Sequence, residues 1–148
     1  MAYAGYLIKL GGSNGTSLPF KYFKAESYSC TPNQRMESEA NRAVTGKLVR
    51  KTVSNTATKI EFETPYMTNA DRAALNTLLT TAMGSSANRL ERKITLEYYN
   101  DETDSYTTGD FYMPDVQYQI YKVDNTRNVI TYSPVRYAFI EYGKEWAG

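Results

Sequence analysis

The sequence contains no histidine, and it has a single cysteine and a single tryptophan among its 148 residues. Without histidine the chain lacks the commonest general base, the Ser-His-Asp and Cys-His pairings, and the histidine-containing zinc sites. Enzyme chemistry would have to rest on carboxylates, lysine or tyrosine. We therefore interpret the chain as a protein that is not an enzyme, and we expect no catalytic residue, no metal and no cofactor.

Disulfides and membrane spans are also missing from the sequence. The one cysteine, Cys30, has no partner in the chain, which suits folding in a reducing compartment, and its expected role is that of a small buried residue. No apolar run approaches the length of a membrane span, and the first twelve residues have too short an apolar stretch for a secretory signal. We expect a soluble product without a membrane anchor.

Tyrosine, by contrast, is abundant, with 14 copies. Its flat amphipathic ring suits strand faces that are half buried or pressed against another protein. The length is that of one ordinary domain, so we expect a single domain over residues 1–148. Composition thus favours a β-rich interaction protein.

The net charge of +1 hides two halves of opposite sign. Residues 1–60 hold 9 Lys/Arg against 3 Asp/Glu (+6), and residues 61–148 hold 8 against 13 (−5). One interpretation is that this reflects only which strands face solvent. The other is that subunits meet basic face to acidic face, as in a head-to-tail assembly.

Strand patterns dominate the chain. Residues 58–65 alternate Ile60 and Phe62 with Glu61 and Glu63, and residues 92–100 alternate in the same way before a predicted turn at 101–105. About eight or nine such strands predict a mainly β fold, an antiparallel sandwich or barrel.

One helix interrupts this pattern, over about residues 69–83. Leu75, Leu78 and Leu79 belong to a single apolar stripe, which predicts a face packed on the sheet. Thr68, three residues before Asp71, predicts a capped start, and Gly84 predicts the end. We expect this flanking helix to cover an open side of the sheet.

A long early hairpin is predicted over about residues 34–58, with its tip near residues 41–46. It is polar and carries most of the basic charge of the first half. The basic residues that we expect at a subunit interface, or lining a channel, are Arg35, Arg42, Lys47, Arg50 and Lys51. Binding of single-stranded nucleic acid is the less favoured alternative, because the strand holding the last three lacks aromatic residues.

Two acidic segments could in principle form a catalytic pair or a calcium-binding loop. Glu61 and Glu63 point to one face of a strand, as paired catalytic carboxylates do, but a solvated or salt-bridged face is the favoured interpretation. The stretch NDETDSYTTGD is rich in oxygen ligands, yet it lacks the spacing of an EF-hand, so we expect a plain hairpin turn.

Five segments resemble a small family of proteins encoded in the tail modules of long-tailed phages and prophages of Gram-positive bacteria, near the tape-measure gene. They are TPNQRM, TKIEFETPYMT, ERKITLEYYNDETDSY, GDFYMPD and YSPVRYAFIEYG, and together they span from about residue 30 to near the end. The resemblance implies a fold similar to that of tail tube proteins and of the ring-forming domain of distal tail proteins. It offers no catalytic residues.

What the resemblance implies is a structural subunit of a phage or prophage tail. We expect a distal-tail-like ring, a homohexamer, that joins the tail tube to the tip or baseplate and lines the central channel. Its expected partners are further copies of itself, the tail tube protein, the tape-measure protein and the tip or hub proteins, with DNA only in transit. The expected location is the virion, after synthesis in the host cytoplasm. A tail tube or head-to-tail completion protein is the alternative.

Overall fold

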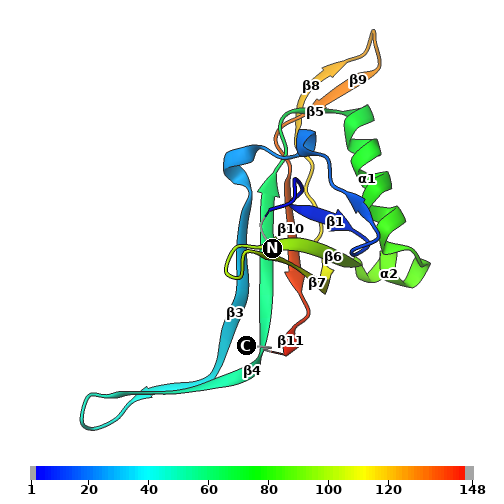
Figure 1. The fold of residues 1–148 in the computed structure, drawn as a ribbon. Coiled ribbons are helices and arrows are strands. Elements are labelled where there is room, and N and C mark those ends of the chain that lie inside the picture. Colours follow the sequence, from blue (N-terminus) through cyan, green and yellow to red (C-terminus); the bar gives the residue numbers. More distant parts are fainter. Residues whose placement is uncertain (1–2, 146–148) are drawn as a thin grey trace.

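The computed structural model describes residues 3–145, with the side chains of all of these except residues 38–41 and 49. The described chain is mainly antiparallel β structure with one main helix and a long early hairpin, which confirms the predicted fold class (Figure 1). Its sheets do not close into a barrel.

Two sheets make up the β structure. The larger is ordered β3 (Ser29–Arg42), β4 (Leu48–Glu63), β10 (Arg136–Glu141), β7 (Ser105–Tyr112), β6 (Lys93–Asn100), β1 (Ile8–Leu10) and β2 (Thr16–Ser17), and the short β11 (Lys144–Glu145) also pairs with β4. The smaller is ordered β5 (Met67–Thr68), β9 (Val129–Tyr132) and β8 (Ile120–Asp124). Two 3-10 turns, η1 (Phe20–Tyr22) and η2 (Ala25–Ser27), lead into β3.

The main helix, α1 (Asn69–Met83), has the predicted bounds and ends. The Thr68 hydroxyl accepts the Asp71 backbone N–H at 3.3 Å, and the Asp71 carboxylate accepts the Thr68 N–H at 3.4 Å, so both form a capping box. Gly84 follows with a φ of +81°, a conformation that favours glycine. A short second helix, α2 (Ser86–Glu91), was not predicted, because its one exposed leucine, Leu90, forms no apolar stripe.

The core lies between α1 and the large sheet. Ile94, Leu96 and Tyr98 of β6 are buried on alternate positions, as the sequence pattern predicts. Near the start of β10, the Phe62 ring stacks on Tyr137 with centroids 5.6 Å apart. Because these strands are buried in the body of the sheet, they form a rigid base for the elements that leave it.

The β3–β4 hairpin is longer than predicted. Its strands begin at Ser29 and end at Glu63, so residues 58–63 are part of one continuous β4 and not a separate strand. No glycine or proline interrupts the chain between Leu48 and Glu63, and the sequence therefore offers nothing to divide this strand. The turn at residues 43–47 is closed by a hydrogen bond from the Ala43 N–H to the Lys47 carbonyl oxygen at 2.7 Å.

Candidate assembly interface

The distal half of the β3–β4 hairpin leaves the body of the protein as a two-stranded arm. We define the arm as residues 36–53. Beyond Asn55, which pairs with β11, no third strand pairs with β4 within the described chain. Several apolar side chains of the arm are exposed, including Met36, Val44, Leu48 and Val53. An isolated two-stranded hairpin is at best marginally stable in water, and within the described chain no other element covers these exposed side chains.

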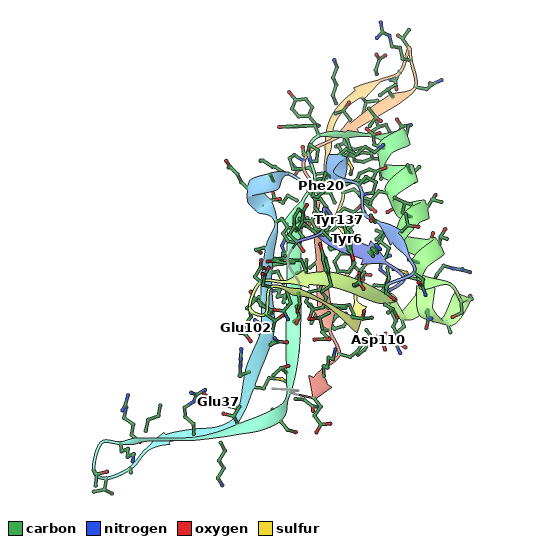
Figure 2. The ribbon with its side chains drawn as sticks, in the orientation of Figure 1. Tyr6, Phe20, Glu37, Glu102, Asp110 and Tyr137 are labelled. Atoms are coloured by element: carbon green, nitrogen blue, oxygen red, sulfur yellow. The ribbon has the colours of Figure 1, made fainter. Side chains whose placement is uncertain are left out.

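A bend at its base aims the arm away from the sheet. The pairing of β3 with β4 shifts register between Arg35 and Glu37, and again between Glu37 and Glu39. Such bulges bend a strand and increase its twist. Glu37 lies at the bend, as Figure 2 shows, and its carboxylate accepts a hydrogen bond from Arg50 on the opposite strand.

The structure does not gather the five predicted basic residues at one place. Arg35 lies at the base of the arm, where its guanidinium binds both carboxylate oxygens of Glu102 at 2.8 and 3.1 Å. Arg50 pairs with Glu37 within the arm, and Arg42 donates to the Gly46 carbonyl oxygen at the tip. Lys47 and Lys51 are exposed on the arm.

Glu102 belongs to the turn between β6 and β7, which we call the acidic turn, residues 101–104. The Asn100 side chain accepts the backbone N–H groups of Glu102 and Thr103, and the Tyr99 hydroxyl donates to Asp104 at 2.5 Å. Hydrogen bonding from Arg35 lowers the pKa of the Glu102 carboxyl. The turn thus presents ordered carboxylates at the surface.

Aromatic rings lie beside the acidic turn in what we call the tyrosine cluster, formed by Tyr3, Tyr6, Tyr99 and Tyr106. Tyr6 stacks on Tyr106 with centroids 4.4 Å apart, and Tyr99 contacts both Tyr106 and Tyr3 edge-on, at 5.7 and 6.0 Å. The ammonium of Lys9 lies over the Tyr6 ring, 4.5 Å from its centroid. Carboxylates and aromatic faces together suit cationic side chains.

A second hairpin, β8–β9, projects at the end of the molecule opposite to the arm (Figure 1). Ile120, Tyr121 and Val123 are 54%, 64% and 50% exposed, and Tyr66 packs edge-on against Tyr121. We call these four residues the apolar patch. These residues were not singled out from the sequence; the available signal was the run of adjacent apolar residues beside a polar turn.

A buried polar group fixes the base of the arm. Glu141 is 4% exposed, its carboxylate accepts the Thr58 N–H at 3.0 Å, and the Thr58 hydroxyl is 2.8 Å from the Tyr98 hydroxyl. Burial raises the pKa of the Glu141 carboxyl, an effect that the Thr58 hydrogen bond partly offsets. The absence of a side chain at Gly109 provides space for the Glu141 carboxylate, because a Cβ at Gly109 would lie 2.2 Å from the second Glu141 oxygen.

The helix residues singled out from the sequence face inward to different degrees. Leu75 and Leu79 are 0% and 4% exposed, whereas Leu78 is only partly buried against the core. Leu78 lines a groove between α1 and the β1–β2 turn, together with Thr77, Thr81, Ala82, Leu10, Gly11, Gly15 and Thr16.

Of the acidic pair considered from the sequence, Glu61 forms ion pairs on the strand face. Glu61 binds the Lys59 ammonium at 3.1 Å and also binds Arg136, and these partners, Arg136 foremost, lower its pKa. Among the described residues no group of three or more Cys, Asp or Glu is placed to hold a metal ion. In the same part of the chain no helix is long and apolar enough to cross a membrane.

These features define a mainly β protein whose two exposed hairpins extend beyond its own core. The chain belongs to a family of unknown function, DUF6711, whose family profile matches residues 1–142. No curated protein and no solved structure matches the sequence. The function of the chain therefore has to be argued from its own geometry.

Proposed function

We propose that the chain is a structural subunit of a phage or prophage tail, a distal-tail-like protein that forms a ring between the tail tube and the tail tip. The observation that carries the proposal is the arm, which leaves the core as a two-stranded hairpin with exposed apolar residues and no third strand beside it within the described chain. A surface of this kind becomes stable when neighbouring copies cover it.

The shape of the chain supports assembly in a ring. The arm and the β8–β9 hairpin lie at opposite ends, so they cannot cover each other within one copy (Figure 1). Contacts between unlike surfaces of identical copies are head-to-tail, and they close into a ring when the rotation between neighbours permits. A hexamer is the ring size that the resemblance to tail proteins implies.

The resemblance from residue 30 onward supplies the biological setting, and the fold is compatible with it. A structural subunit needs no catalytic side chain, so the lack of histidine in the sequence is compatible with this role. A tail tube or head-to-tail completion protein would use the same fold and the same arm, at another axial position. The proposal is the distal ring, with the tube, tape-measure and tip proteins as its partners.

Immunogold labelling of phage particles tests this function. Antibodies raised against the purified chain should label purified particles at the junction of tail tube and tip, and pre-immune serum should not. Label along the whole tube would assign the chain to the tube instead. If purified particles contain no trace of the chain by mass spectrometry while the infected cells do, the structural role is wrong.

A further inference from the structure

The unpartnered arm has the opposite charge to the β6–β7 region. The arm, residues 36–53, carries four basic residues against Glu37 and Glu39, a net charge of +2: Arg42, Lys47, Arg50 and Lys51. The two strands β6 and β7 with their turn, residues 93–112, carry five acidic residues against Lys93, a net charge of −4: Glu97, Asp101, Glu102, Asp104 and Asp110. Complementary surfaces of this kind steer association and fix its register.

We infer that the arm of one copy docks on the acidic turn and tyrosine cluster of a second copy of this chain. This inference rests on the proposed ring and names the receiving surface within it. The occupant of that surface is the arm tip, with Arg42 and Lys47 near the carboxylates of Asp101 and Asp104. All four residues are exposed in the single copy.

The chain already uses this recognition internally. Arg35, at the base of the same hairpin, binds both oxygens of Glu102 in the acidic turn. A bidentate pair of this kind is stronger and more specific in geometry than a single contact. Lys9 over the Tyr6 ring shows that the tyrosine cluster likewise accepts a cation.

Geometry prevents the tip from reaching the acidic turn of its own copy. The register shifts on both sides of Glu37 bend the arm, and Figure 1 shows the tip pointing away from the β6–β7 turn, while Glu102 in Figure 2 lies beside β3, before the bend. The contact is therefore between copies. It also covers Leu48, which is exposed in the single copy and follows Lys47 in the arm.

A charge-swap pair tests the docking. The arm variant carries Arg42→Glu, Lys47→Glu and Lys51→Glu. The turn variant carries Asp101→Lys and Asp104→Lys, and it leaves Glu102 in its internal pair with Arg35. Each variant alone brings like charges together at every interface. An equal mixture restores opposite charges at both types of interface, since each arm then meets a turn of the other variant.

Sedimentation velocity provides the measurement, with circular dichroism as the test of folding. Each variant alone should need a roughly tenfold or higher concentration to assemble than the unmodified chain, and the mixture should assemble nearly as the unmodified chain does. A neutral control variant with Gln at the same three arm positions should assemble at a concentration between that of the unmodified chain and that of the Glu-substituted arm variant. Assembly of the unmodified chain should also weaken with added salt, a readout that needs no variant.

The outcomes separate the docking from the ring itself. If the unmodified chain forms rings, and both variants do so equally well, the arm docks elsewhere while the proposed function stands. A mixture that fails to assemble although both variants are folded likewise overturns the docking. If the unmodified chain stays monomeric at every concentration, ring and docking are both wrong, and an accompanying loss of single-stranded DNA binding in the arm variant would assign the arm to nucleic acid.

Discussion

At the scale of single residues, the least expected group is Glu141. It is a carboxylate on the last core strand, nearly buried, with one oxygen bound to the Thr58 N–H and the other without a hydrogen-bond partner among the described atoms. A buried carboxyl is easier to keep neutral than charged. The alternation of β10 places Glu141 on the same face as the buried Tyr137 and Phe139, but a charged side chain argues against burial, so the sequence pattern alone does not mark this residue.

Replacing Glu141 by Gln should change how stability depends on pH. The raised pKa means that the folded protein binds this proton more tightly than the unfolded chain does. The free energy of unfolding therefore falls as pH rises from the ordinary carboxyl pKa through the raised one. Gln keeps the acceptor for Thr58 and never ionises, so the stability of the variant relative to the unmodified chain should be greater at about pH 8 than at about pH 5.

Urea unfolding at the two pH values provides the comparison. Glu61→Gln is the matched control: Arg136 and Lys59 lower the pKa of Glu61, so its contribution is lost only below the ordinary carboxyl pKa, and its removal should change the free energy of unfolding by the same amount at both pH values. If the free energy of unfolding of the Glu141→Gln variant differs from that of the unmodified chain by the same amount at both pH values, the pKa of Glu141 is not raised by folding.

At the scale of elements, α1 and the long hairpin could be predicted because their signals are local. Thr68, Asp71 and Gly84 mark the helix ends within a few residues, and a long polar stretch around a glycine-containing turn marks the hairpin. The bend at Glu37 and the pair of Arg35 with Glu102 could not be predicted. The bend needs a register that only the folded pair defines, and the ion pair joins residues 67 apart.

The apolar stripe of α1 should contribute unequally to stability. Leu75→Ala should lower the free energy of unfolding by about 2 to 5 kcal/mol, because a fully buried leucine leaves a cavity. Leu78→Ala should cost less, since Leu78 lines an open groove. Thermal or urea unfolding of both variants provides the test. Equal losses, or a larger loss for Leu78→Ala, would mean that the groove is closed in solution.

At the scale of the whole molecule, the chain combines a rigid base with two extensions. The buried contacts of Glu141, Thr58 and Tyr98 hold the root of β4, and the arm continues from it without a core of its own. At the other end, the apolar patch on the β8–β9 hairpin exposes Tyr121 and its neighbours. Predicting these extensions from sequence required knowing where the core ends, which depends on the tertiary packing of all strands together.

The role of the arm in assembly is tested by comparing the full chain with an arm-shortened variant. Glu37 and Thr52 are cross-strand partners, so residues 38–51 can be replaced by an Asn-Gly turn that rejoins the two strands. The account predicts that sedimentation of the full chain gives a closed oligomer, seen as rings by electron microscopy, and that the shortened variant is a folded monomer. Rings formed equally by the shortened variant, or a full chain that sediments as a monomer at all concentrations, would contradict it.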